Sequence, residues 1–216
     1  IRSYLDLNLD LPYIYNKIGK DKRVRTAIKK YAGLRIIRQP LWECAASFII
    51  SAYNNIPRIK GIIDSLCGCL GAPILSQDRK VYSFPSPQAF AGSDLSRLRL
   101  CGLGFRAEYL KETARLFQDK TISRGILKKA PYAKAKELLM GLRGVGHKVA
   151  DCVLLFSAGR LEAFPVDVWI KRVIEKLYFK GRPTSEKKIR EFAAGYFGEY
   201  AGYAQQYLYH YARRDE

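Results

Sequence analysis

The sequence has few of the side chains from which metal centres and disulfide frameworks are built. It contains two histidines and five cysteines, and the cysteines show no regular spacing. An odd number of unpatterned cysteines is typical of reduced thiols in an intracellular protein. Familiar zinc sites need clustered Cys and His ligands, so we expect none here. The chain begins at Ile1 rather than Met, so we expect a fragment or a processed form, with any targeting signal upstream of it.

Acidic residues are also scarce relative to basic ones. Thirty-eight Lys and Arg against twenty Asp and Glu give a formal net charge of +18. Such an excess favours a polyanionic partner, because each neutralised phosphate releases a condensed counterion. A membrane surface would also suit this charge, but the sequence has no lipid-anchor motif and no apolar run near the roughly 18 residues of a membrane span. Nucleic acid is therefore the expected partner, and no membrane is expected.

Alternating β-type patterns are rare, and most apolar residues follow helical spacing. With 48% hydrophobic residues, the chain can form a folded core and is not a disordered basic tail. One helix is expected to begin at Leu11-Pro12, and another to follow Asp167 and run to about Tyr178. Residues 34–37 form a short extended piece, and residues 83–87 a hinge-like loop. The other expected helices span residues 22–31, 40–52, 57–70, 105–118, 132–142, 147–157, 184–196 and 201–213. The fold class is all-α.

The most specific local pattern is the pair of glycines in the segment 142–150, LRGVGHKVA. Gly144 and Gly146 join two expected helices through a turn too tight for Cβ atoms, with positive φ expected. Such a turn directs backbone amides and the positive end of the second helix outward. It is either a simple corner between helices or a clamp for a DNA phosphate. The basic charge and the lysine that follows favour the clamp, with Gly144, Val145, Gly146 and His147 at the DNA.

Lys148, in the first turn of the second helix, has two chemically distinct candidate roles. As an ammonium it would contact a phosphate, and as a neutral amine it would act as a nucleophile. Asp167, in the segment FPVDV directly before a helix, favours the second role. It is a good N-cap, and a fixed carboxylate there can also stabilise positive charge that develops at a deoxyribose C1′.

Taken together, GVGHKVAD and the downstream PVDVW resemble the signature of the helix-hairpin-helix base-excision DNA glycosylases. Two branches of that superfamily carry four cysteines near the C-terminus for an iron-sulfur cluster, whereas here no cysteine follows Cys152. Residues 48–59, 103–109 and 200–205 instead resemble segments of the 8-oxoguanine branch. The likeness extends from about Tyr4 to about Tyr211.

The resemblance implies a fold of two helical subdomains flanking a DNA-binding cleft, with the whole chain 1–216 forming the helical glycosylase region. Residues 40–178 would hold the wedge, the hairpin and the catalytic Asp, and residues 1–39 with 179–216 would form the second subdomain. The branch usually has an N-terminal β-rich domain as well, which we expect to be absent from this chain.

The implied activity is that of a bifunctional glycosylase and AP lyase. Lys148 would attack C1′ of the damaged nucleotide, release 8-oxoguanine and form a Schiff base, after which β-elimination nicks the strand. Asp167 would stabilise the developing positive charge and orient Lys148. No cofactor is required, although the hairpin carbonyls are compatible with a structural cation. The implied protein is a monomer that acts on double-stranded DNA containing oxidised guanine. Its expected location is intracellular and with the DNA, in the cytoplasm or nucleoid of a prokaryote or in a nucleus.

The resemblance also assigns the pocket for the extruded base. Cys152, four residues after Lys148, would form one wall, although the residue alone reads as a small buried hydrophobe. Tyr209 would form the opposite wall, and Gln205 would read the Watson–Crick edge, because an amide carries both a donor and an acceptor.

A further group of residues is expected at the rest of the DNA surface. Phe105 resembles the residue that enters the base stack, and Arg58 with Arg106 the pair that holds the orphaned base; each arginine could instead contact a phosphate. The remaining expected contacts are Tyr53, Asn54, Asn55 and Trp169.

Two of these residues depart from the family pattern. Tyr53 stands where many relatives have asparagine, so we expect weak discrimination for cytosine opposite the lesion. Trp169 stands where relatives often have histidine.

Two alternatives stay open from the sequence. One is a glycosylase/lyase for another oxidised base, such as a pyrimidine, with a different pocket and the same nucleophile. The other is a non-catalytic helix-hairpin-helix module that binds DNA, which would have no use for Asp167 or Gln205.

Overall fold

The computed structural model describes residues 1–76 and 79–215, and the side chains of 1–75 and 81–213. Its contacts divide the chain into two compact units, one of residues 1–39 with 150–216 and one of residues 40–149. We call them the terminal unit and the central unit. The second boundary lies at 149/150 rather than near residue 178 as expected. Asp167 therefore belongs to the terminal unit, while Lys148 belongs to the central one.

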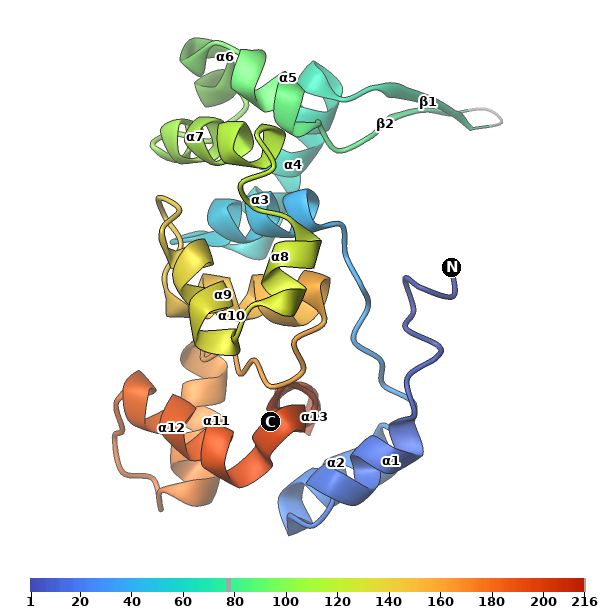
Figure 1. Cartoon of the computed structure of the whole chain (residues 1–216), viewed down its shortest axis with the longest axis vertical. Helices are drawn as coiled ribbons and strands as arrows, with labels where there is room; N and C mark the ends of the chain where they lie inside the picture. Colours follow the sequence, from blue (N-terminus) through green and yellow to red (C-terminus); the bar gives the residue numbers. More distant parts are fainter. Residues whose placement is uncertain (77–78, 216) are drawn as a thin grey trace. The chain divides into compact units, whose positions relative to one another are not determined.

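The central unit is a set of short helices with one β-hairpin (Figure 1). The contacts of α7 with α3, α5 and α6 organise this unit, and its core includes Ile49, Leu66, Phe90, Leu103 and Leu110. The elements of the central unit are α3 (Leu41–Ser51), α4 (Ile56–Leu70), β1 (Pro73–Ser76), β2 (Arg79–Tyr82), α5 (Pro87–Gly92), α6 (Leu95–Leu100), α7 (Arg106–Gln118), α8 (Arg124–Lys129) and α9 (Tyr132–Met140).

The terminal unit is built around its C-terminal helix, which contacts every α-helix that lies wholly within this unit. This helix has few apolar residues overall, yet it forms a core because it buries two large aromatic side chains, Tyr203 and Tyr207, completely. The elements are α1 (Leu11–Ile18), α2 (Lys22–Lys30), the π-helical turn η1 (Leu154–Ala158), α11 (Val168–Tyr178), α12 (Glu186–Phe197), the 3₁₀ turn η2 (Gly198–Tyr200) and α13 (Ala201–Asp215). The remaining helix, α10 (His147–Val153), contains the boundary between the units.

Local chemistry explains where these helices start. Side chains of Asp10, Asn55, Ser123 and Ser185 accept hydrogen bonds from backbone amides in the first turns of α1, α4, α8 and α12. Each such cap satisfies an amide that has no partner within the helix. The all-α prediction is confirmed, and each expected helix is present.

The differences from the expected elements are small. The hairpin β1–β2 and the helices α5, α6 and α8 were not expected, and the last turn of the 147–157 helix is π-helical. Residues 34–37 and 83–86 lie outside helices and strands. Within the described residues, no helix is long and apolar enough to cross a membrane.

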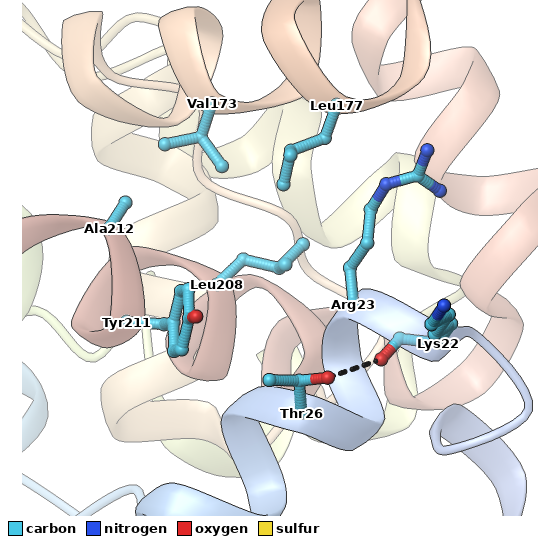
Figure 2. A pocket seen from close by; sticks show the side chains of 8 residues that line it. All are labelled: Lys22, Arg23, Thr26, Val173, Leu177, Leu208, Tyr211 and Ala212. Carbon is cyan, nitrogen blue, oxygen red and sulfur yellow. Dashed lines mark hydrogen bonds between the residues drawn. The ribbon is translucent and has the colours of Figure 1, made fainter. Parts of the chain in front are cut away.

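A cavity of about 260 Å³ lies in the terminal unit between α2, α11 and α13 (Figure 2). Val173, Leu177 and Leu208 give it an apolar lining, and Lys22 and Arg23 also line it. None of the residues expected at the active site lines this cavity. The extruded base is therefore not expected to bind there.

Candidate active site

The hairpin before α10 has the positive φ that was expected of its glycines at one of the two positions. Gly144 has φ +79°, and a Cβ there would lie 2.7 Å from Cδ2 of Tyr109. Gly146 has no positive φ, and a Cβ at that position would meet no atom within 4 Å. The fold therefore requires glycine at 144. At 146 the open space leaves room for another molecule to approach the backbone.

Between the glycines, Val145 anchors the turn instead of facing outward. Its side chain is buried, and its amide donates to the carbonyl of Leu142 at 3.1 Å. That amide is thus already used within the turn, so a phosphate at the hairpin would be held by other amides. His147 is exposed at the start of α10.

Tyr109 connects the hairpin with the segment expected to enter the base stack. Its ring packs against Gly144 on one side and lies edge-on to Phe105, with ring centroids 5.7 Å apart. The Arg143 guanidinium covers it at 4.7 Å and also pairs with Glu112, with Nη1 and Oε1 2.8 Å apart. Tyr109 was not expected at the site from the sequence. The aromatic at its i+4 spacing from Phe105 was the available signal.

Lys148 is half-buried in the first turn of α10. Its Nζ lies 4.8 Å from the centre of the Phe48 ring on α3, so the side chain is held against that helix. Sequence reasoning placed Phe48 in a matching segment without giving it a role. Cys152 lies on the same helix, buried and in no disulfide, one turn after Lys148. The helical repeat brings these two residues to one face, as expected.

Asp167 caps α11, as predicted. Its Oδ1 accepts a hydrogen bond from the amide of Ile170 at 2.8 Å, which fixes the carboxylate at the positive end of the helix. Trp169 is half-exposed in the first turn of α11, and the guanidinium of Arg172 lies over its ring at 5.6 Å.

Gln205 lies close to the Asp167 segment within the terminal unit. It is 4% exposed, and its Nε2 donates to the carbonyl of Pro165 at 3.3 Å, while its Oε1 accepts from Gln206 at 2.5 Å. Tyr209, one turn further along α13, accepts a hydrogen bond from Arg213 at 3.1 Å. The amide of Gln205 is thus fixed in orientation, and because an amide has two N–H donors and two acceptor lone pairs, these two bonds leave one of each for a base edge.

The turn between α3 and α4 uses its asparagines for its own structure. Asn54 donates through Nδ2 to the carbonyl of Ile50 and accepts from the amide of Asn55, while Asn55 accepts from the amide of Arg58. Arg58 and Tyr53 are exposed.

Arg106 differs most from expectation, because it is buried and its guanidinium bonds to backbone carbonyls. In this conformation it does not present its donors to a base.

Clustered side chains that could bind a metal ion are scarce in the part of the chain that the structure describes. In the described part of the chain, no cluster of three or more His, Cys, Asp or Glu side chains could bind a metal ion. A cation at the hairpin would have backbone carbonyls as its ligands, and that of Leu142 already accepts a hydrogen bond from Val145.

Two family models together match most of the chain. Residues 46–197 match the family model of the HhH-GPD superfamily base excision DNA repair proteins. Residues 1–45 match that of the 8-oxoguanine DNA glycosylase N-terminal domain. In this chain residues 1–45 form α1, α2, the start of α3 and irregular segments, and contain no strand.

The similar proteins include both sequences and solved structures. The chain is 35% identical to the probable N-glycosylase/DNA lyase of Methanothermobacter thermautotrophicus, over 99% of this chain and 74% of that protein. It is 32% identical to the N-glycosylase/DNA lyase of Saccharomyces cerevisiae, over 97% of this chain and 65% of that one.

Among solved structures, it is similar to the Clostridium acetobutylicum 8-oxoguanine glycosylase/lyase bound to double-stranded DNA with cytosine opposite 8-oxoguanine. The TM-score is 0.91 at 36% identity, over 99% of this chain and 73% of that one. The chain thus spans about two thirds to three quarters of these relatives, and it belongs to the HhH-GPD superfamily of base excision DNA repair proteins.

Proposed function

We propose that this protein is a bifunctional DNA glycosylase and AP lyase that removes 8-oxoguanine from double-stranded DNA. The observation that carries the proposal is the placement of Lys148. It stands in the first turn of α10, directly after a hairpin whose Gly144 has a positive φ that other residues rarely adopt, in a chain similar to N-glycosylase/DNA lyases over nearly its whole length.

The proposed chemistry uses this chain's own side chains. The neutral amine of Lys148 attacks C1′, the bond from C1′ to the base breaks, and the base leaves with the bonding electrons. The sugar ring then opens to a Schiff base, loss of a C2′ proton follows, and the 3′ phosphate departs by β-elimination. A covalent route of this kind divides a difficult displacement into easier steps and needs no cofactor. A cation at the hairpin would serve structure alone.

Asp167 is the proposed electrostatic partner of this step. As the N-cap of α11 its carboxylate is fixed in direction, so stabilising the positive charge at C1′ needs little reorganisation.

Recognition of the lesion requires the nucleotide to leave the base stack. We propose that Cys152 and Tyr209 contact the faces of the extruded base and that Gln205 contacts its edge. The hairpin from Gly144 to His147, together with Arg58, Phe105, Asn54, Asn55 and Trp169, would contact the DNA. We also propose that the protein acts as a monomer.

A cleavage assay with matched duplexes tests the proposal. Duplexes with 8-oxoguanine, an oxidised pyrimidine or no damage are incubated with the protein and with the Lys148→Gln variant. The proposal predicts a nick with a β-elimination end on the 8-oxoguanine duplex, absent with Lys148→Gln. A nick on the pyrimidine duplex alone would show that the substrate is another oxidised base and not 8-oxoguanine. Tight binding without any nick, on an abasic duplex as well, would indicate a DNA-binding module.

A further inference from the structure

The turn between α3 and α4 presents an aromatic side chain almost completely to solvent. Tyr53 is 95% exposed, and its backbone has φ +50°. Bulky L residues rarely adopt this left-handed conformation, and it persists only where the surroundings hold it. Neither burial nor backbone preference explains a tyrosine at this position. A ligand that takes up the ring would.

A buried arginine holds this turn in addition to the two asparagines. Arg106 is 3% exposed, its Nε donates to the carbonyl of Ala52 at 3.0 Å, and its Nη2 donates to the carbonyls of both Ala52 and Tyr53. Its Nη1 lies 3.5 Å from the carbonyl of Leu103, in the turn before α7. The guanidinium therefore connects two turns that are about fifty residues apart in sequence.

The second of these turns presents an aromatic side chain as well. Phe105 is 53% exposed, and its ring packs against the Arg106 guanidinium at 4.4 Å. Burial and the positive charge of Arg58 lower the pKa of Arg106, so keeping this arginine here has an electrostatic cost. The hydrogen bonds to the two turns offset that cost. We call Tyr53 and Phe105 the aromatic pair.

We infer that Tyr53 is a second intercalating residue beside Phe105, and that Arg106 is a positioning residue that holds the aromatic pair instead of reading the orphaned base. The inference rests on the proposed function, because extrusion of a nucleotide leaves a gap in the stack. Aromatic side chains stack on every base, whereas a phenol cannot match the donor and acceptor pattern of one base. The gap is thus filled without selection of the opposite base.

The fluorescence of 2-aminopurine tests the role of Tyr53. The duplex carries this base opposite a stable abasic analogue, and the proteins are the wild type, Tyr53→Phe, Tyr53→Ala and Tyr53→Asn. Tyr4→Ala is the control, because Tyr4 is another exposed tyrosine, 46% exposed and in the terminal unit. The wild type, Tyr53→Phe and Tyr4→Ala should quench the fluorescence on binding, while Tyr53→Ala and Tyr53→Asn leave it bright.

Excision rates give the size of the effect. Loss of one base–aromatic stack should slow removal of 8-oxoguanine by Tyr53→Ala roughly 5- to 100-fold, by a similar factor opposite all four bases. Tyr53→Phe keeps the ring and should therefore be slowed less than Tyr53→Ala. If Tyr53→Ala quenches and excises like Tyr4→Ala, Tyr53 does not intercalate.

The opposite base separates the two roles of Arg106. A positioning role predicts that Arg106→Lys slows excision by a similar factor opposite all four bases and speeds chymotrypsin cleavage after Tyr53, because the turn loosens. A loss confined to one opposite base, with unchanged cleavage after Tyr53, would show that Arg106 reads the base. The same two measurements are made on Arg106→Met and compared with those on the wild type, at a temperature at which circular dichroism shows each variant folded.

The proposed function and this inference can fail separately. The aminopurine experiment needs only binding to an abasic analogue, and no step of catalysis. If the wild type does not cut 8-oxoguanine DNA and yet quenches through Tyr53, the function is wrong and the intercalation stands.

Discussion

Gly144 and Gly146 are both glycines of one turn, but the structure requires glycine only at position 144. Any side chain at 144 needs φ +79° and meets the ring of Tyr109, while 146 has open space around it. We therefore predict that Gly144→Ala lowers the free energy of unfolding by about 1–2 kcal/mol. Gly146→Ala should leave stability within about 0.5 kcal/mol of the wild type and weaken DNA binding.

Urea unfolding and DNA titration of the two variants check this prediction. Equal destabilisation by both substitutions would contradict the assigned geometry. Unchanged DNA affinity of Gly146→Ala would contradict a phosphate at the hairpin.

Asp167 combines a structural and a proposed chemical role, and one substitution separates them. Asparagine also caps helices well, so Asp167→Asn should keep the stability of α11 while the charge is lost. We predict a fall in excision rate of about 100-fold with an unchanged melting temperature. Asp167→Ala should in addition lose about 1 kcal/mol of stability. If Asp167→Asn excises at the wild-type rate, the carboxylate acts only as a cap.

Among the elements, α2 is fixed to α11 and α12 through one carboxylate. Asp21 is buried, caps α2 by accepting from the amides of Arg23 and Val24, and accepts from the hydroxyls of Tyr178 and Tyr196 at 3.1 and 3.0 Å. Burial, then the charge of Asp21, raises the pKa of the Tyr178 phenol above its usual value. The folded protein therefore keeps a proton that the unfolded chain loses above about pH 10.

Because the folded-state pKa is the higher one, this contribution to stability is complete below pH 10 and is lost as the pH rises further. We predict that the free energy of unfolding, measured in urea from pH 8 to 11, falls above pH 10. Tyr178→Phe should fall less steeply and lose about 1 kcal/mol at pH 8, where its hydrogen bond is missing. Tyr4→Phe is the control, and identical slopes for Tyr178→Phe and the wild type would contradict the account.

The elements also show what the sequence could and could not predict. Helices with caps and regular apolar spacing, such as α4 after Asn55, were predictable because their signals are local. The strands Pro73–Ser76 and Arg79–Tyr82 were not, since four residues are too few for alternation to stand out. The proposed site residues rest on motif resemblance, and the burial of Arg106 depends on carbonyls about fifty residues away and leaves no local signal.

For the whole molecule, the net charge of +18 makes the binding constant for DNA depend on salt concentration. Counterion release predicts that the logarithm of the binding constant falls linearly with that of salt concentration, by about 0.9 per phosphate contacted by Lys or Arg. Lys148→Gln should leave this slope unchanged, because the proposed nucleophile does not hold a phosphate. A slope smaller by about 1 would instead assign Lys148 to the DNA backbone. Fluorescence anisotropy with undamaged DNA at several salt concentrations measures both.

The division of the whole molecule into two units also explains why its second boundary lies at a different residue from the one expected from the sequence. The terminal unit joins residues 1–39 to residues 150–216, and the boundary falls inside α10. A sequence signal for a boundary is a linker rich in Pro, Gly or polar residues, and a continuous helix carries none. The motif that contains both Lys148 and Cys152 therefore extends across two units.

Trapping with borohydride tests the central claim, that Lys148 is the nucleophile, most directly. The protein is incubated with a duplex containing 8-oxoguanine in the presence of borohydride, beside Lys148→Gln and an undamaged duplex. The account predicts a covalent protein–DNA adduct that requires both the lesion and Lys148, because reduction fixes the Schiff base. An adduct that persists in Lys148→Gln, or its absence from the wild type even on an abasic duplex, would contradict the account.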